Sequence, residues 1–332
     1  MPVTIYDIAR EASVSIATVS RVFNNSERVS ARTRARVEDV AQELGYRPHA
    51  MAQSLARRST NLISAVIPVL TNYFYMEVLR GIQAALAETE FDLLVYAATT
   101  PDDVDGQLAR ALQRGRSEGL LLLSTPITPE RRRLLQRSRQ SVVLVDESDT
   151  EFDSILVDNV EGAYRATRHL IEAGHRRIAH ITVSPEPFVA RQRRAGYERA
   201  LSEAGLEPIV CASDLRPLGF CEESGYQAAA DLLRLRGCPD AIFVATDVQA
   251  LGVLSALHDA GLNVPDDVAV VGFDDIKPSA YARLSTLRQP MYEMGRLSVE
   301  RLLSRLDTPD RLAETTRFTP ELITRSSSPH LA

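Results

Sequence analysis

Several features that would indicate particular classes of protein are missing from this 332-residue chain. It has no tryptophan, a single lysine and three cysteines, Cys211, Cys221 and Cys238. The cysteines lack the spacing of metal ligands, and their odd number does not fit a disulfide framework. No apolar run approaches the roughly 20 residues that a membrane span needs, and the N-terminus has no signal-peptide pattern. We therefore expect a cytoplasmic protein with reduced thiols and no membrane partner.

The motifs of common enzyme classes are missing as well. No G-x-G-x-x-G sequence follows a predicted strand, no Walker-type glycine loop is present, and neither Ser184 nor Ser279 lies in a nucleophile elbow. His169, His175 and His180 are predicted on a helix, in a loop and on a strand, which does not favour shared metal ligation. We therefore expect no enzymatic activity, no cofactor and no metal ion.

The charge of the chain is unevenly distributed. Residues 1–60 contain nine arginines and six acidic residues, a net charge of +3, whereas the remainder contains 29 basic and 38 acidic residues, a net charge of −9. An acidic protein with one basic end is typical of a chain whose basic end meets a polyanion while its body binds something else.

The basic end has the pattern of three short helices. Thr4 is a suitable N-cap, with Asp7 at the third helical position. Apolar residues recur with helical spacing in the first and third helices, at Ile5, Ile8, Ala9 and Ala12 and at Val37, Val40, Ala41 and Leu44. A short turn over residues 12–15 precedes the second helix, predicted from Ser15 to about Asn24, and Gly45 ends the third helix. This order indicates a helix-turn-helix unit.

The second helix is predicted to lie in the major groove of DNA. Its first exposed residues, Ile16, Ala17 and Thr18, would face base edges, and Ser20 and Arg21 would follow one turn later. Arginine can donate two hydrogen bonds to guanine, whereas Ile16 and Ala17 can only make apolar contacts, for example with a thymine methyl group. The alternative is a small helical domain with a solvated face, but Ile16 stands where such a helix would place a polar residue.

These residues resemble the LacI/GalR family of bacterial transcriptional regulators over the whole chain. The stretches that carry the resemblance are 3–9, 14–22, 24–25, 29–30, 33–34 and 44–48, together with Val37 and Ala41. The DNA-contacting residues that we predict are Thr4, Ser15, Ile16, Ala17, Thr18, Ser20, Arg21, Asn24, Ser30, Thr33, Tyr46, His49, Ala52 and Leu55. Ser13 departs from the family, which often has glycine in this turn. A left-handed backbone at Ser13 would cost on the order of 1 kcal/mol relative to glycine.

Residues 48–61 are predicted to form a hinge helix and linker. The segment is rich in alanine but has too little apolar surface to fold alone. The resemblance implies that it becomes helical on DNA and inserts Leu55 into the minor groove as an apolar wedge. His49 and Gln53 replace the asparagine and arginine usual in the family, which leaves their phosphate contacts open. The alternative is a plain solvated linker.

From residue 62 onward, short apolar runs alternate with helical patterns, which predicts parallel sheets. The predicted fold class is α/β, a three-helix helix-turn-helix head followed by a two-lobed body like that of periplasmic binding proteins. The predicted domains are 1–47 for the head, 48–61 for the hinge and 62–332 for effector binding and dimerisation. The predicted N-lobe covers about 62–160 with 291–318, and the C-lobe covers about 161–290 with 319–326. Residues 326–332 are expected to form a disordered tail.

Polar and aromatic residues follow the carboxyl ends of the predicted strands, where parallel sheets bind ligands. Acids, an amide, arginine and aromatic rings together suit a polyhydroxylated ligand. The resemblance sharpens the set of predicted effector-binding residues to Asn72, Tyr73, Phe74, Asp146, Arg193, Phe220, Thr246 and Asp274. Thr246 replaces the usual asparagine, so the ligand can differ from those of better-known sugar repressors.

Neighbouring residues have alternative interpretations. Asp158 and Asp247 fit helix capping as well as ligand contact, and Asp275 fits a structural role. Tyr75 is assigned to the dimer face, and Arg191 to a surface ion pair.

The sequence therefore predicts a homodimeric repressor of carbohydrate-uptake or catabolic genes. It would bind a near-palindromic operator and be controlled allosterically by a small ligand, a sugar or sugar derivative, in the cleft between the lobes. One alternative is a co-repressor-dependent regulator with a non-sugar ligand such as a purine. Two others are a sugar-binding protein without DNA function and a sugar-modifying enzyme of two-lobed fold.

Overall fold

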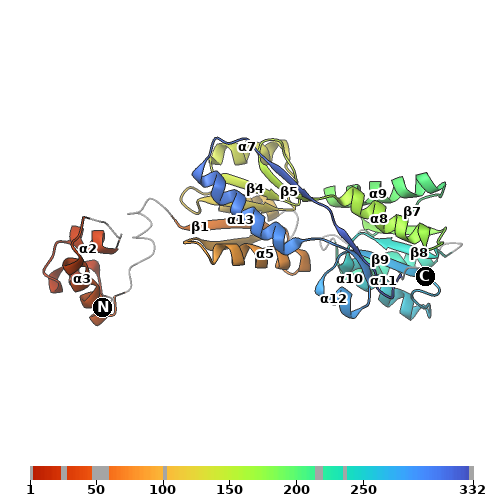
Figure 1. Cartoon of the computed structure of the whole chain (residues 1–332), viewed down its shortest axis with the longest axis horizontal. Coiled ribbons are helices and arrows are strands. Elements are labelled where there is room, and N and C mark those ends of the chain that lie inside the picture. The colour runs from red at the N-terminus through yellow and green to blue at the C-terminus, as the bar shows by residue number, and fades with distance from the viewer. Residues whose placement is uncertain are drawn as a thin grey trace. The chain divides into compact units, whose positions relative to one another are not determined.

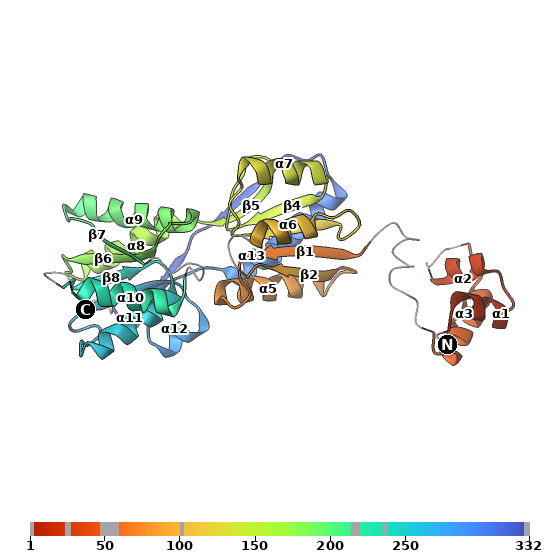
Figure 2. The same cartoon turned by 180° about the vertical axis from the view of Figure 1, so that it is seen from behind.

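The computed structural model describes residues 3–23, 28–46, 60–99, 103–213, 220–234 and 238–328. The chain divides into two compact units, which we treat separately: Met1–Leu62 with Arg114–Glu118, and Ile63–Gln113 with Gly119–Ala332. The first unit contains a helical head, and the second contains two α/β lobes (Figures 1 and 2).

The head consists of three helices, α1 (Ile5–Glu11), α2 (Ile16–Phe23) and α3 (Ala31–Glu43). Each begins at a capping residue. The backbone amide of Thr4 donates to the Asp7 carboxylate over 3.0 Å, Ser15 Oγ accepts the amide of Thr18 over 3.1 Å, and Ser30 Oγ accepts the amide of Thr33 over 3.2 Å. These caps satisfy amide groups that the first turn of a helix leaves free. The three N-termini therefore follow from local sequence, as predicted.

One apolar core holds the three helices of the head together. Ile8 and Ala12 of the first helix segment, Val19 and Val22 of α2, and Val37 of α3 are all buried in it. Ser13, in the turn between α1 and α2, has a positive φ of 50°. Its side chain is exposed. The turn therefore has the left-handed geometry that glycine adopts without strain.

The first lobe is built on a six-stranded parallel sheet of order β11-β5-β4-β3-β1-β2. Its strands are β1 (Leu62–Ile67), β2 (Asp92–Ala97), β3 (Gly119–Leu123), β4 (Ser141–Val145), β5 (Asp153–Val157) and β11 (Thr315–Phe318). Helices α5 (Tyr73–Leu86) and α13 (Met291–Asp307) cover one face, and α6 (Val104–Ala111) and α7 (Pro129–Ser138) cover the other (Figures 1 and 2). Burial on both faces explains why these strands are continuous apolar runs.

The second lobe has a sheet of order β12-β10-β9-β8-β6-β7. Its strands are β6 (Ile178–Val183), β7 (Ile209–Ser213), β8 (Ala241–Val244), β9 (Ala269–Asp274), β10 (Ser285–Arg288) and β12 (Glu321–Ile323). Its helices are α8 (Asn159–Glu172), α9 (Phe188–Ala204), α10 (Glu222–Leu233), α11 (Asp247–Asp259) and the short α12 (Lys277–Tyr281). Strand β12 is antiparallel to β10, which departs from the purely parallel sheet that the sequence predicts.

The chain passes between the lobes three times. It leaves the first sheet after β5, returns after β10 through α13 and β11, and crosses again to β12.

Glycines bring the covering helices into backbone contact, because a Cβ at Gly81 of α5 would lie 2.0 Å from the carbonyl oxygen of Tyr292 in α13. A Cβ at Gly295 of α13 would lie 2.1 Å from the carbonyl oxygen of Val78 in α5. Each lobe is therefore a closely packed body made from separate segments of the chain.

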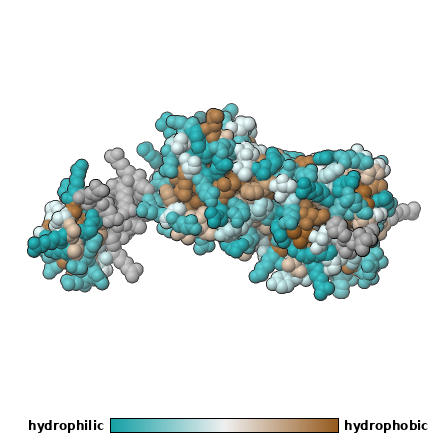
Figure 3. All heavy atoms as spheres, in the orientation of Figure 1, coloured by the Kyte–Doolittle hydropathy of each residue, from teal (hydrophilic) through white to brown (hydrophobic). Residues whose placement is uncertain are grey.

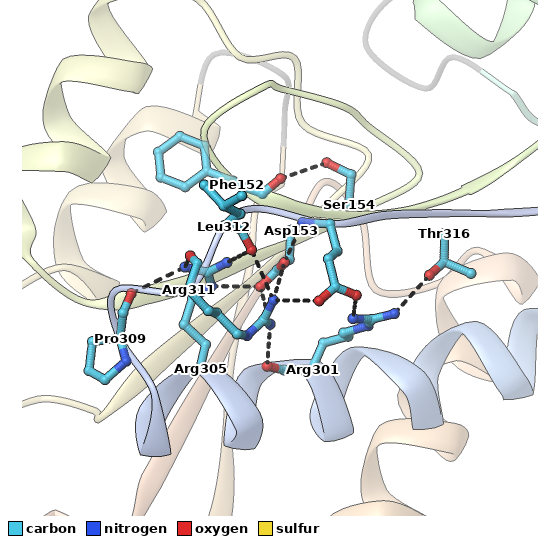
Figure 4. Close-up of polar contacts among 10 residues, drawn as sticks. Phe152, Asp153, Ser154, Arg301, Arg305, Pro309, Arg311, Leu312 and Thr316 are labelled. Atoms are coloured by element: carbon cyan, nitrogen blue, oxygen red, sulfur yellow. Dashed lines mark hydrogen bonds and ion pairs between the residues drawn. The ribbon is translucent and has the colours of Figure 1, made fainter.

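A buried carboxylate joins β5 to α13 and to the segment after it (Figure 4). Asp153 is fully buried, and it accepts hydrogen bonds from Arg305 Nε at 2.6 Å, from Arg311 Nη2 at 2.6 Å and from the amide of Glu314 at 2.8 Å. Although burial raises the pKa of Asp153, these donors together hold that pKa below its ordinary value. The charge of Asp153 is thus fully compensated by the fold.

The prediction of a disordered tail from residue 326 onward is wrong for two residues, because Ser327 and Ser328 are buried. Ser327 Oγ donates to the carbonyl of Val270 over 2.7 Å and accepts the amide of Ser285 over 2.7 Å. His169 Nε2 lies 2.8 Å from Ser328 Oγ. The polar composition that predicts disorder here instead supplies hydrogen-bond partners to strand β9 and helix α8.

Replacing Ser13 by glycine should stabilise the head, because glycine removes the steric cost of the left-handed turn. We expect a gain on the order of 1 kcal/mol in the free energy of unfolding of the head. Thermal or urea unfolding of the isolated fragment 1–46 monitored by circular dichroism measures it, provided that the wild-type fragment shows a cooperative transition. Ser13→Ala is the matched control, and an equal gain in that variant would contradict the explanation.

Candidate functional site

The predicted reading helix presents an exposed face. Ile16 is 42% exposed, Ala17 and Arg21 are exposed, and Thr18 and Ser20 are half-buried. Val19 and Val22 point into the head core. An isoleucine exposed at the start of a helix gains nothing in the free chain, whereas it can pack on a thymine methyl group in the major groove.

Several of the predicted DNA-contacting residues also cap helices. Thr4, Ser15, Ser30 and Thr33 occupy the first turns of the three helices, and the Ser15 and Thr18 hydroxyls lie 2.9 Å apart. Tyr46 packs its ring against Phe23, with ring centroids 5.6 Å apart. The predicted contacts Asn24, His49, Ala52 and Leu55 lie outside the described residues.

In the body, the side chain of Arg193 is the centre of the predicted effector site. It is 3% exposed and lies on α9. Its Nε donates to Asn159 Oδ1 over 2.8 Å, its Nη1 donates to the carbonyl of Ala245 over 2.6 Å, and its guanidinium carbon lies 3.8 Å from the centroid of the Phe273 ring. Among the described residues, none accepts a hydrogen bond from Nη2. The guanidinium is therefore held in place by Nε and Nη1, and Nη2 remains available as a donor.

Asp274 lies beside Arg193 at the carboxyl end of β9. Its Oδ1 is 3.7 Å from Arg193 Nη1 and accepts a hydrogen bond from Gln289 Nε2 over 2.5 Å. Its φ of 130° is positive, so a non-glycine residue is held in a rarely adopted backbone conformation there. Burial raises the pKa of Asp274 to about 7, because the nearby charge of Arg193 offsets only part of the desolvation.

A second carboxylate, Asp146, follows β4 in the other lobe. Its Oδ2 accepts a hydrogen bond from Ser124 Oγ over 2.8 Å, and Ser124 is also close enough to Tyr75 to act on the pKa of its hydroxyl. Burial raises the pKa of Asp146 to about 6, opposed by Arg193 and by Ser124. Because Arg193 comes from the second lobe and Asp146 from the first, the electrostatic interaction between them spans the two lobes.

The remaining predicted effector residues lie at the carboxyl ends of strands or next to them. Asn72 caps α5 through a 2.8 Å bond from the amide of Phe74 to its Oδ1, Tyr73 is half-buried and Phe74 is buried. Thr246 caps α11 by accepting the amide of Gln249 over 3.3 Å, and its hydroxyl lies 3.5 Å from Gln249 Oε1. Phe220 is half-buried.

The structure decides between the alternative roles of three acidic residues. Asp158 caps α8 by accepting the amide of Glu161 over 3.0 Å, and Asp275 pairs with Arg288 and with Arg325 at 2.7 Å each. Asp247 is fully buried and accepts the hydroxyls of Ser279 and Thr286 and the amide of Ile276. These three acids have the partners of structural residues.

Arg191 and Tyr75 differ from the roles predicted for them, a surface ion pair for Arg191 and the dimer face for Tyr75. Arg191 donates to the carbonyl of Glu186 over 2.8 Å, and among the described residues it forms no ion pair within 4 Å. The Tyr75 side chain lies beside Ser124, within reach of the charges of Asp146, Asp274 and Arg193, and burial raises the pKa of its hydroxyl. Sequence reasoning placed Tyr75 and Asn159 near strand ends without assigning them to the effector site, and it missed Ser124 and Gln289. Ser124 and Gln289 directly follow β3 and β10, so a systematic reading of strand ends would have included them.

The atoms that the fold leaves without partners define what the cluster can bind. Among the described residues, no donor reaches Asp146 Oδ1, Asp274 Oδ2 or Gln289 Oε1, and the last is a buried atom. The matching free donor is Nη2 of Arg193. Within these four side chains, three free acceptor oxygens and one free donor nitrogen are complementary to a ligand that is mainly a hydrogen-bond donor.

The comparisons with known proteins agree with this division into head and body. Residues 4–49 match the family described as bacterial regulatory proteins, lacI family, and residues 167–328 match a periplasmic binding protein-like domain. None of the described helices has the length and hydropathy of a membrane span.

Relatives cover almost the whole chain. The catabolite control protein A of Priestia megaterium is 37% identical over 92% of each chain, and the ribose operon repressor of Escherichia coli K12 is 35% identical over 98% of this chain and 99% of its own. The solved structure of the lac repressor dimer bound to operator and the anti-inducer ONPF aligns with a TM-score of 0.87 at 29% identity, over 99% of this chain and 100% of that one. The protein therefore belongs to the LacI family of bacterial transcriptional regulators.

Proposed function

We propose that this protein represses carbohydrate-uptake or catabolic genes and is controlled by a small uncharged sugar bound between Asp146, Arg193 and Asp274. The observation that carries the ligand class is the set of free atoms, three acceptors and one donor. Sugar hydroxyls are donors that can point at several acceptors at once, and the pyranose or furanose C–H face packs on aromatic rings such as Phe74.

The charge of the site argues against an anionic effector. Arg193 faces Asp146 and Asp274, with Asp247 also close enough to act on its charge, and it is already bonded to Asn159 and Ala245. A sugar phosphate would add negative charge to a buried cluster in which burial already raises the pKa values of all three acids. An uncharged sugar avoids this repulsion, and its hydroxyls donate hydrogen bonds to the carboxylates.

The names of the relatives support the same direction. The ribose operon repressor covers 98% of this chain, and its name connects it with a pentose. We infer a pentose or hexose for this protein.

The head supplies the DNA-binding end of the mechanism. Two heads of a homodimer would each read one half of a near-palindromic operator, with Arg21 and Ile16 facing bases and Leu55 inserted as a wedge. Exposed apolar side chains on both lobes, among them Leu70, Met76 and Tyr281, are available for dimerisation, and Figure 3 shows hydrophobic patches on each lobe. Because its target is chromosomal DNA, we place the protein in the cytoplasm.

Operator and effector would be coupled through the lobes. A ligand that changes the contact between Asp146 and Arg193 changes how the lobes meet, and in a dimer this alters the spacing of the two heads. Such coupling is reciprocal and is typically worth about 1–3 kcal/mol. We propose that the cluster of Asp146, Arg193 and Asp274 binds a regulatory ligand and does not catalyse a reaction. The domain limits that we propose are 1–47, 48–61 and 62–332.

Replacing Arg21 by glutamine should weaken operator binding by about 1–3 kcal/mol and relax specificity at the base pair it reads, because a bidentate contact to guanine is lost. Arg36→Gln is the matched control, since Arg36 is exposed on α3, outside the predicted reading helix. Affinities for a selected operator and for its single-base variants measure both. If the two variants lose the same affinity without a change of base preference, α2 does not read sequence.

Asp274→Asn should abolish sugar binding while leaving operator binding intact, because the amide keeps the shape of the carboxylate but removes the charged acceptor. A thermal-shift screen of uncharged sugars, sugar phosphates and purines against the wild type identifies the ligand, and calorimetry compares the variant. We expect stabilisation by at least one uncharged sugar. Stabilisation by a phosphate ester alone would contradict the proposed ligand class, and loss of operator binding in Asp274→Asn would assign the residue a structural role.

The raised pKa of Asp274 also predicts a pH dependence. The native state binds this proton more tightly than the unfolded chain does, so its contribution to stability is present at low pH and is lost as pH rises to about 7. The melting temperature of the wild type relative to Asp274→Asn should therefore fall between pH 5 and pH 8. Asp153, whose pKa is lowered, is the control, and the difference between wild type and Asp153→Asn should stay constant over this range. A constant difference for both variants would contradict the electrostatic description of the site.

A further inference from the structure

Helix α7 carries a concentration of positive charge that contrasts with the rest of the body. Residues 129–140 contain five arginines and one acidic residue, a net charge of +4, whereas residues 61–332 together have a net charge of −9. The helix lies on the face of the first sheet opposite to α5 and α13 (Figure 2). Leu135 is the only buried residue of α7. Most of the helix surface therefore faces solvent or a partner.

Two of the five arginines attach α7 to the rest of the lobe. Arg131 Nε donates to Asp105 Oδ1 over 2.6 Å, and Arg132 Nε donates to Asp149 Oδ2 over 2.9 Å. The side chain of Asp149 is only 1% exposed, so its charge needs a partner of opposite sign. These two arginines therefore serve the fold.

The other three arginines have no such role. Arg133, Arg137 and Arg139 are exposed, and among the described residues no carboxylate lies within 4 Å of their guanidinium groups. Arg133 and Arg137 are four residues apart and lie on the same side of the helix, where like charges destabilise it. We call these three residues the basic face of α7. Because the fold gives their charges no partner, the basic face has the character of a binding surface.

Other helices of the body treat exposed arginines differently, because they place a glutamate four residues away. Five such pairs lie within 3.1 Å: Arg165–Glu161 and Arg168–Glu172 in α8, Arg194–Glu198 and Arg199–Glu203 in α9, and Arg296–Glu300 in α13. The open arginines of α7 are therefore not a general consequence of the arginine-rich composition.

The basic face reaches the edge of the sheet at which the chain enters the body. Strands β1, β3 and β4 are parallel and are paired from their first or second residue onward, so they begin at the same edge. Arg139 lies two residues before β4 begins at Ser141, and β1 begins at Leu62, the residue at which the chain leaves the unit that contains the head. Arg137 and Arg139 therefore lie on the edge from which the connection to the head departs.

We propose that the basic face of α7 binds the phosphate backbone of DNA that flanks the operator. DNA is the polyanion that a regulator of this family meets, and arginine donates to phosphate oxygens in a fixed fork geometry. Contacts of this kind do not depend on base sequence, and they add affinity by releasing counterions. The inference concerns a DNA contact of the body and is independent of the identity of the effector.

Binding to two duplexes that share one selected operator tests this site. The short duplex ends with the operator, and the long duplex adds flanks of random sequence on both sides. For the full-length wild type we expect about tenfold tighter binding of the long duplex at low salt, and a slope of log K against log salt that is steeper by about 2–3 for each occupied basic face. In the triple variant Arg133→Gln, Arg137→Gln, Arg139→Gln, both duplexes should bind as the short duplex binds the wild type.

A second triple variant controls for net charge. Arg165→Gln, Arg168→Gln and Arg199→Gln together remove the same charge from the second lobe, where each arginine is paired with a glutamate. This variant should keep the wild-type difference between the two duplexes. Affinity for the short duplex reports that both variants are folded and that their heads bind the operator.

Three results would overturn the proposal. The first is an equal loss of affinity for the long duplex in the two triple variants, and the second is a loss in the α7 variant that is the same for the short and the long duplex. The third is a wild type without preference for the long duplex, which would leave the basic face to an acidic protein partner. A wild type that binds neither duplex would contradict the proposed repressor function as well.

Discussion

The burial of one guanidinium among several carboxylates is the constraint on which the rest of the body depends. Arg193 connects α8, β8 and β9 through Asn159, Ala245 and Phe273, and its charge reaches Asp146 in the other lobe. The single positive charge of Arg193 cannot compensate the three buried acids Asp146, Asp247 and Asp274. Ionising all three carboxyl groups therefore costs free energy. A ligand that brings hydroxyl donors relieves this cost, which gives the protein a physical reason to respond to it.

Asp153 shows what a purely structural buried carboxylate looks like in the same chain. It receives two arginines and a backbone amide, and its pKa is lowered (Figure 4). Asp274 receives one amide and a more distant arginine, and its pKa is raised. The difference between these two aspartates is a difference in the number of donors that the fold supplies. Incomplete satisfaction of a buried group, more than burial itself, therefore distinguishes the proposed binding site from this structural carboxylate.

Much of this architecture was predictable from local sequence. The helix caps at Thr4, Ser15 and Ser30 predict the helices of the head, and the alternation of apolar runs with helical patterns predicts the sheets. Both signals act over a few residues. The position of Gln289 at a strand end could be read from the sequence. Its contacts and those of Tyr75 could not, since they depend on which strand ends become neighbours in space. Ser327 and Ser328 were misjudged for the same reason. Their hydroxyls find partners on β9 and α8, far away in sequence.

The three passages of the chain between the lobes limit how such regulators can be recombined. Each sheet contains a strand that is supplied late in the sequence, β11 in the first and β12 in the second, so neither lobe is a continuous stretch that could be expressed or exchanged alone. Hybrid regulators that pair one operator with another effector should therefore be joined before β1, with the entire stretch from Leu62 to Ser328 transplanted as a piece. A junction in the middle of the body would pair each sheet with a foreign edge strand.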